Sequence, residues 1–216
     1  MKIFKILLLF ITVSTLINCA SGYQKIAPKS INYISTHETD SVKLEYKYDL
    51  LDKKYAKKEL RKGIKLVAVK MTNHSNKDLV FGKDVKLAYE NGANIYVMEN
   101  EKVFKKLKQS PATHLLYLLL TPVNLYTTSG SSNGFQQNTN ATPIGLVLGP
   151  GLAGGNLIAA ASANKKFKTE MLEYNINGTV IKKGETEYGL IGIEADSYEA
   201  LKLIVGYSDR SIVLQE

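Results

Sequence analysis

Hydrophobic and polar positions alternate in two parts of the chain and predict β-strands there. From Val42 to Leu50 every second residue is hydrophobic, which is the period-two pattern of a half-buried strand. Residues 64–71 are more continuously apolar and predict a second, more buried strand, which ends in the polar turn 72–77. Between the two strands, the charged stretch 52–62 predicts a hairpin loop or a short helix.

Shorter strands are expected along the rest of the chain. The dipeptides at 91–92 and 177–178 are both Asn-Gly, which favours the tight turn of a β-hairpin. The strands at 186–193 and 201–205 are expected to pair across 194–200. Seven or eight short strands with turn signals at regular spacing predict a mainly β fold, a β-sandwich. The remaining strands are expected at residues 79–81, 85–89, 95–98, 179–181 and 212–214.

This strand pattern resembles the immunoglobulin-like domains of many envelope lipoproteins. The stretches that carry the resemblance are TNHSNKDLVF at 72–81 and IKKGETEYGLIGI at 181–193. The resemblance implies an immunoglobulin-like β-sandwich, a single domain over residues 41–216. We expect a helical insertion at 109–174 to interrupt this domain, which makes the fold α+β overall.

The insertion contains the most unusual segment of the chain. From Gln109 to Asn164 there is no charged residue, although 22% of the whole chain is charged. Its first part, 111–126, is apolar, and its middle part, 127–140, is a polar loop of low complexity. The last part, 143–163, is apolar and rich in glycine and alanine.

Three interpretations of the segment 110–163 compete. Two helices could pack against one face of the sandwich, the first beginning at Ser110-Pro111 and the second covering 152–174. A hydrophobic hairpin could instead enter a bilayer or lie on it, because lysines flank the segment and it contains no charge. The third interpretation is an interface for self-association or for a partner protein.

Packing on the sandwich is the favoured interpretation. The first arm is shorter than a full membrane span needs, and Pro150 disfavours a continuous second helix. Short apolar helices inside globular proteins are also commoner than re-entrant ones. The glycine spacings 145/149 and 151/155 nevertheless permit a close approach between helices, as in membrane proteins.

The first 18 residues have the parts of an export signal. Lys2 and Lys5 form a positive start, and an apolar stretch from Ile6 to Ile17 follows. This stretch is shorter than the roughly 20 residues that a comfortable membrane span requires. We therefore expect residues 1–18 to be a cleaved signal peptide.

Residues 16–19, Leu-Ile-Asn-Cys, resemble the lipobox of bacterial lipoproteins, with Asn18 where that family prefers Gly, Ala or Ser. The resemblance implies that the signal is removed before Cys19, that the Cys19 thiol is diacylated and that its new amino group is acylated. Cys19 is the only cysteine of the chain, so no intramolecular disulfide can form. Residues 19–40 are expected to form the tether that follows the acylated cysteine.

Resemblance to Gram-negative lipoproteins also implies a location. Ala20 stands where an aspartate would favour the inner membrane, so the outer membrane is expected. No acidic cluster follows Cys19, which favours the periplasmic face over surface display. The sequence pattern is similar to that of small envelope lipoproteins of the Bacteroidetes type. That family has no assigned activity that could be transferred to this chain.

The charge of the chain excludes few partners but argues against nucleic acid. The formal net charge is +8, from 28 basic and 20 acidic residues; without Lys2 and Lys5 of the leader, 28 − 2 leaves 26 basic residues and a net charge of +6. Nucleic-acid-binding proteins usually carry Arg-rich patches interleaved with aromatic residues, whereas the only arginines here are Arg61 and Arg210. We expect a solvated lysine-rich surface, which is compatible with weak attraction to anionic lipid.

No residue pattern points to catalysis, a cofactor or a metal. His37, His74 and His114 lie far apart in the sequence and outside the HExxH and CxxC contexts typical of zinc sites. We expect His74 at the surface and His114 in the interior or at a helix cap.

The sequence therefore predicts a lipid-anchored, non-enzymatic binding or structural module whose ligand is unknown, with Cys19 as the lipid attachment site. The alternative is a membrane-contacting or self-associating assembly component that acts through the apolar hairpin 110–163. The membrane is the partner expected through Cys19, and a protein partner is the one expected through the hairpin.

Overall fold

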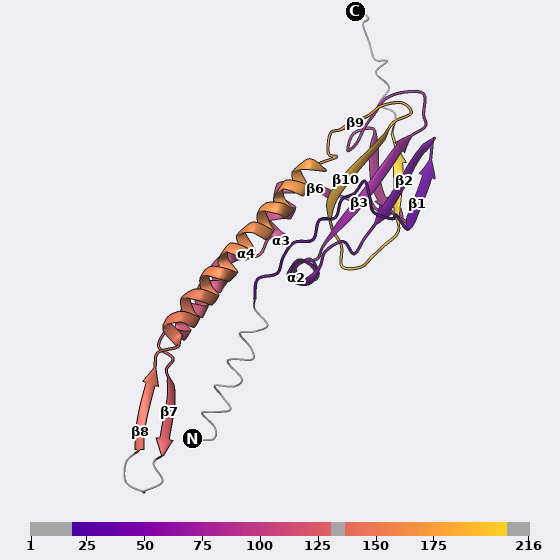
Figure 1. Cartoon of the computed structure of the whole chain (residues 1–216). Coiled ribbons are helices and arrows are strands. Elements are labelled where there is room, and N and C mark those ends of the chain that lie inside the picture. Colours follow the sequence, from indigo (N-terminus) through magenta and orange to yellow (C-terminus); the bar gives the residue numbers. More distant parts are fainter. Residues whose placement is uncertain (1–18, 131–136, 207–216) are drawn as a thin grey trace, which may run out of the picture. The chain divides into compact units, whose positions relative to one another are not determined.

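The computed structural model describes residues 19–130 and 137–206 (Figure 1). The predicted signal peptide and the predicted strand at 212–214 lie outside these residues. The described chain divides into two compact units. We call residues 19–22 with 109–164 the charge-free unit, and residues 23–108 with 165–206 the sheet unit.

The sheet unit contains a five-stranded antiparallel sheet. The alternating residues from Val42 onward form one of its strands, as predicted. Val42 is the first residue of this strand and pairs with Asn73 of the neighbouring strand. Along this strand the hydrophobic side chains are buried and the intervening polar ones are half-buried. The strand order is β1-β2-β3-β10-β6, with β1 at Ser35–Thr39, β2 at Val42–Lys47, β3 at Ile64–Asn73, β10 at Thr186–Glu194 and β6 at Val97–Met98.

Four further strands pair separately and share a hydrophobic core with the main sheet. Strand β5, Val85–Tyr89, pairs with β11, Leu201–Val205, and β4, Leu79–Val80, pairs with β9, Val180–Ile181. Burial of these apolar side chains is the main force that holds the strands together. The shared core contains Val42, Leu44, Val67, Val69, Met71, Phe81, Val85, Leu87, Ile191, Ile193, Leu201 and Leu203, among others.

The second face of the central strands is covered by helices. Helix α2, Lys53–Lys62, and helix α3, Asn100–Leu107, contact β3 and β10, respectively. Helix α4, Gly145–Glu173, ends in the sheet unit, where Phe167 is fully buried. The Phe167 ring lies 5.1 Å from the ring centroids of Tyr23 and Tyr55 and 5.8 Å from that of Phe104. The described fold is therefore mixed α+β, with an antiparallel sheet and one long helix.

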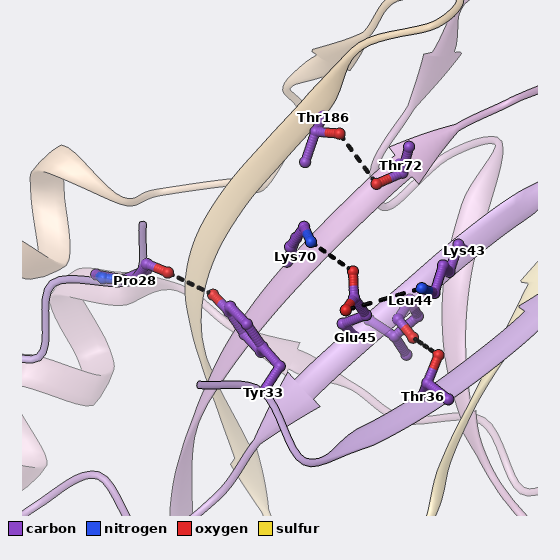
Figure 2. Close-up of polar contacts among 9 residues, drawn as sticks. All are labelled: Pro28, Tyr33, Thr36, Lys43, Leu44, Glu45, Lys70, Thr72 and Thr186. Atoms are coloured by element: carbon purple, nitrogen blue, oxygen red, sulfur yellow. Dashed lines mark hydrogen bonds and ion pairs between the residues drawn. The ribbon is translucent and has the colours of Figure 1, made fainter. Parts of the chain in front are cut away.

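Polar residues also link neighbouring strands of the sheet (Figure 2). Glu45 on β2 pairs with Lys70 on β3 at 2.7 Å and with Lys43 at 3.8 Å. The hydroxyls of Thr72 on β3 and Thr186 on β10 lie 3.0 Å apart. These cross-strand pairs lie on half-buried positions that alternate with the core residues, as the period-two pattern requires.

The predicted strands are largely present, but one predicted pairing is wrong and another is only partly formed. The stretch 95–98 was expected to return along the preceding strand after the turn at 91–92. Its start does so, because the Ile95 N–H donates to the Leu87 carbonyl at 3.0 Å and Asn94 bridges to Ala88, whereas Val97 and Met98 pair with Ile193 and Gly192 of β10. The strands at 186–193 and 201–205 were expected to pair with each other, but β10 lies between β3 and β6 while β11 pairs with β5. Strand partners depend on contacts between residues far apart in the sequence, which local patterns do not encode.

Other local predictions are confirmed or corrected. The charged stretch 52–62 is a helix, α2, as one of its two alternatives predicted. In the turn 72–77, the Asn73 side chain accepts hydrogen bonds from the backbone N–H and hydroxyl of Ser75 and donates one to the carbonyl of Lys77. Part of the predicted tether is also folded, because β1 lies within residues 19–40 and Ile26 is buried.

The charge-free unit differs from its prediction in two places. It contains a 3-10 helix, η1, at Pro111–Leu120, and the charge-free part of α4. The middle part, predicted as a loop, forms an antiparallel hairpin of β7, Leu125–Gly130, and β8, Gln137–Thr142 (Figure 1). Pro150 does not end the second helix: α4 continues through it in its second turn, although proline has no backbone N–H to donate.

Candidate membrane-contact site

Large apolar side chains cover the outside of the charge-free unit. Most of the exposed large hydrophobic residues in the described chain belong to it. Soluble monomers rarely expose so many neighbouring apolar side chains, and large exposed apolar patches mark interaction surfaces or membrane contacts. The exposed residues are Leu115, Leu116, Leu118, Leu119, Leu125, Tyr126, Leu146, Val147, Leu148, Leu152 and Ile158.

The buried residues in the charge-free part of α4 are small, which reverses the usual pattern of a soluble helix. Within the charge-free part of α4, the buried side chains are those of Ala153, Ala160, Ala163 and Asn164. In water, the large apolar side chains of a helix face the core and the small or polar ones face solvent. In lipid, small residues let helices approach closely while large ones contact the acyl chains.

Two glycines allow η1 and α4 to pack closely. A Cβ atom on Gly149 would lie 2.6 Å from the Thr121 hydroxyl and 3.2 Å from the Tyr117 carbonyl, and one on Gly145 would collide with the Leu120 carbonyl. The close approach predicted for the 145/149 spacing is thus confirmed. Around residues 151 and 155 there is open space, so the second spacing has no partner within the described chain.

The length of the charge-free part of α4 matches the thickness of a bilayer. Helix α4 is the one helix of the described residues that is long and apolar enough to cross a membrane. Its charge-free part, residues 145–164, is about 30 Å long at 1.5 Å per residue, which equals the hydrocarbon thickness of a typical bilayer. Only 22% of its most apolar window is buried, whereas the core helix of a soluble protein is mostly buried.

Cys19, the predicted lipid attachment residue, belongs to the same charge-free unit. It is exposed, and its Sγ atom lies 4.0 Å from the hydroxyl of Tyr117 on η1. The next residue, Ala20, donates its backbone N–H to the Asn156 side chain on α4 at 2.6 Å. Acyl chains on this thiol would therefore begin among the exposed apolar side chains of η1 and α4.

A ladder of side-chain amides fixes the chain just after Cys19. Gln109 accepts the backbone N–H of Ser21 at 3.1 Å and donates to the Ser21 carbonyl at 2.6 Å. Gln109 in turn exchanges two hydrogen bonds with the Asn164 side chain, at 2.8 and 2.9 Å. All three residues are buried, and their amides satisfy backbone groups that would be costly to bury unpaired.

Residues 23–27 are held by one buried carboxylate in the sheet unit. Glu170 on α4 accepts the Tyr23 hydroxyl at 2.6 Å, the Ile26 N–H at 3.1 Å and the Ala27 N–H at 2.7 Å. Burial and the hydrogen bond to Glu170 raise the pKa of the Tyr23 hydroxyl, which stays a donor at every physiological pH. This part of the predicted tether is packed and hydrogen-bonded.

A second candidate site, which the sequence did not indicate, is a groove of about 450 Å³ in the sheet unit. The Tyr48 and Tyr198 rings lie 5.4 Å apart, and the Lys65 ammonium lies 4.3 Å above the Tyr198 ring. Burial raises the pKa of Tyr48, whose hydroxyl donates to the Glu199 carbonyl. The groove is lined by Ile34, Ser35, Tyr46, Tyr48, Asp49, Tyr198, Glu199 and Ala200.

The histidines do not gather into a site. His74 is exposed and His114 is buried against the Tyr117 ring, as expected, while His37 accepts the Leu203 backbone N–H. No group of three or more His, Cys, Asp or Glu in residues 19–130 and 137–206 could hold a metal ion.

Comparisons with protein-family models, with curated proteins and with solved structures found no match to this chain.

Proposed function

We propose that the protein is a lipid-anchored, non-enzymatic component of the bacterial cell envelope whose charge-free unit contacts the bilayer beside the acylated Cys19. The observation that carries this proposal is the placement of Cys19 within a unit that has no charged side chain and exposes its large apolar residues. The outer membrane, facing the periplasm, is the proposed location.

Two attachments would then act on one membrane. Each buried methylene of an acyl chain contributes about 0.8 kcal/mol, and exposed apolar side chains contribute roughly 25 cal/mol per Å² removed from water. When the protein binds the membrane, the exposed apolar side chains of the charge-free unit would no longer be in contact with water. This arrangement explains why the unit buries alanines and exposes leucines.

The sheet unit is proposed to be an immunoglobulin-like β-sandwich that acts as the soluble module. The shared core between the five-stranded sheet and the β5–β11 and β4–β9 pairs supports this assignment. Loss of one layer would leave the buried face of the other exposed to water.

The test separates the lipid from the apolar unit. A Cys19→Ala chain is exported behind a signal sequence of the non-lipoprotein type, so that the leader is still removed. We expect mass spectrometry to show no acyl chains, yet we expect most of the protein to stay with the membranes after an alkaline wash. Release of this variant into the soluble periplasmic fraction would refute the membrane contact and leave only the lipid anchor.

The tyrosine groove supports a second candidate function, the binding of a small organic cation. Among the described residues that line the groove, the charged ones are Asp49 and Glu199, although the whole chain is basic. Aromatic faces attract ammonium groups, and the Lys65 ammonium above Tyr198 has this geometry within the protein itself. The volume lies within the range of small-ligand sites.

Tetramethylammonium is the simplest probe of this groove. We expect it to bind with millimolar affinity, and we expect Tyr198→Ala to weaken binding about three- to fivefold, because one ring contributes about 0.5–1 kcal/mol. Tyr96→Ala, which removes another exposed tyrosine outside the groove, is the matched control. Saturation-transfer NMR on the probe measures the affinity, and equal binding by both variants would exclude the groove.

A further inference from the structure

We infer that the sheet unit carries a basic cluster, formed by Lys58, Arg61, Lys62 and Lys108, that binds the phosphate groups of anionic lipids. This inference rests on the proposed membrane contact and names the lipid that the contact selects. The cluster joins the C-terminal half of α2 to the residue that follows α3. Its occupant is a membrane surface.

The geometry brings cations from two helices together. The Lys58 ammonium donates a hydrogen bond to the backbone carbonyl of Lys108. Arg61 and Lys62 follow Lys58 by three and four residues on the same helix, which places them on its face. Lys58 is half-buried and the other three are exposed, so the group combines one fixed cation with three that can reach a ligand.

No internal anion neutralises these four cations within the described residues. Other lysines of the helical layer do have such partners, since Lys102, Lys106 and Lys168 pair with glutamates at 3.1 to 3.4 Å. Burial, and then the charges of the neighbouring cations, lower the pKa of Lys58. An anionic ligand would relieve this repulsion, whereas solvated surface lysines need no such relief.

Helix stability alone does not explain the cluster. Arg61 and Lys62 in the last turn of α2 complement the helix dipole. Lys58 is not in that last turn, and Lys108 lies on a different element. Lys58 and Lys108 have local contacts of their own, because the Lys58 ammonium donates to the Lys108 carbonyl and the Lys108 ammonium lies 5.8 Å from the Phe104 ring centroid. None of these contacts supplies an anion to the four cations.

One residue of the cluster adjoins the charge-free segment in the sequence. Lys108 is bonded directly to Gln109, the first residue of the charge-free segment, and Lys165 and Lys166 follow its last residue, Asn164. If the segment enters a bilayer, its borders are at the level of the lipid headgroups. Cations within a few ångströms of that surface are attracted to anionic headgroups, and the attraction falls within a Debye length.

Vesicle flotation tests the inference on the chain from residue 19 to 216 with Cys19→Ala. The vesicles contain either phosphatidylcholine alone or phosphatidylcholine with 30% phosphatidylglycerol. We expect binding to both, and tighter binding to the anionic vesicles by roughly two orders of magnitude at low salt. High salt should remove most of this preference.

The decisive variant replaces the four cluster residues by glutamine, which keeps much of each side chain. We expect it to lose the preference for anionic vesicles while binding neutral ones as before. The matched control replaces Lys102, Lys105, Lys106 and Lys168, which removes the same net charge from residues that have glutamate partners. It should retain most of the preference, and circular dichroism should show both variants folded.

Each contrary result has a distinct meaning. Equal binding of the unsubstituted chain to both vesicles refutes the lipid selectivity and leaves the membrane contact intact. Failure to bind either vesicle refutes the proposed function together with this inference. If both variants lose the preference for anionic vesicles equally, the preference comes from net charge. If millimolar inorganic phosphate displaces the protein from the anionic vesicles, the cluster binds a free anion. Either result refutes a lipid-specific site.

Discussion

Arginine at both Leu119 and Val147 is expected to release the protein from membranes when Cys19 is also replaced by alanine. These side chains are 74% and 75% exposed, on η1 and α4 of the charge-free unit. In water, substitutions at such exposed positions change stability by less than about 0.5 kcal/mol. In the hydrocarbon of a bilayer, each arginine costs about 2.5–3.5 kcal/mol. If these residues face water, the variant should fractionate as its parent does; if they face lipid, it should be released from the membranes.

The control variant carries arginine at Ile34 and Tyr96, which are 74% and 72% exposed in the sheet unit. We expect it to remain with the membranes after an alkaline wash, while the first variant appears in the soluble fraction. Immunoblots of the two fractions measure the partition. If both variants fractionate as the Cys19→Ala parent does, the charge-free unit is not in contact with lipid.

Phe167→Ala is expected to lower the free energy of unfolding by about 3–5 kcal/mol, the usual range for an aromatic residue removed from a well-packed core. Phe167 is fully buried and its ring is surrounded by those of Tyr23, Tyr55 and Phe104. Removal of the Phe167 ring would leave a cavity where α4 packs with α2, α3 and the segment after Cys19. Because a domain is stable by only about 5–15 kcal/mol, this change removes a large share of the total.

Leu172→Ala on the same helix is the control, because Leu172 is 55% exposed. Urea unfolding of the Cys19→Ala chain in a mild detergent, followed by tyrosine fluorescence, gives both values. We expect the control to differ from its parent by less than about 0.5 kcal/mol. A similar small difference for Phe167→Ala would mean that the aromatic cluster does not hold the sheet unit together.

Local patterns predicted the elements of the sheet unit better than their partners. The alternation from Val42 onward and the apolar run of β3 correspond to strands in the structure. Helix α3 was missed, because its eight residues present only a short apolar face formed by Val103, Phe104 and Leu107. The pairing of β10 with β3 joins residues more than 110 positions apart, and such pairings leave no trace in a short window of sequence.

The candidate site was visible in the sequence only in part. The lipobox resemblance and the absence of charge from 109 to 164 are local features, and both point to residues of the candidate site. The ladder that joins Ser21, Gln109 and Asn164 spans sequence separations of 88 and 55, so no motif could reveal it. A usable signal was present, however: amide side chains stand at both ends of the charge-free segment.

The amide ladder also limits how far the charge-free unit can lie from the Cys19 thiol. Two peptide units separate Cys19 from Ser21, and a chain of that length extends at most about 7 Å. With Ser21 held by Gln109, acyl chains on Cys19 would have almost no slack. An acylated Cys19 would therefore keep the charge-free unit within a few ångströms of the lipid, and a force applied to this unit would be transmitted to the lipid layer.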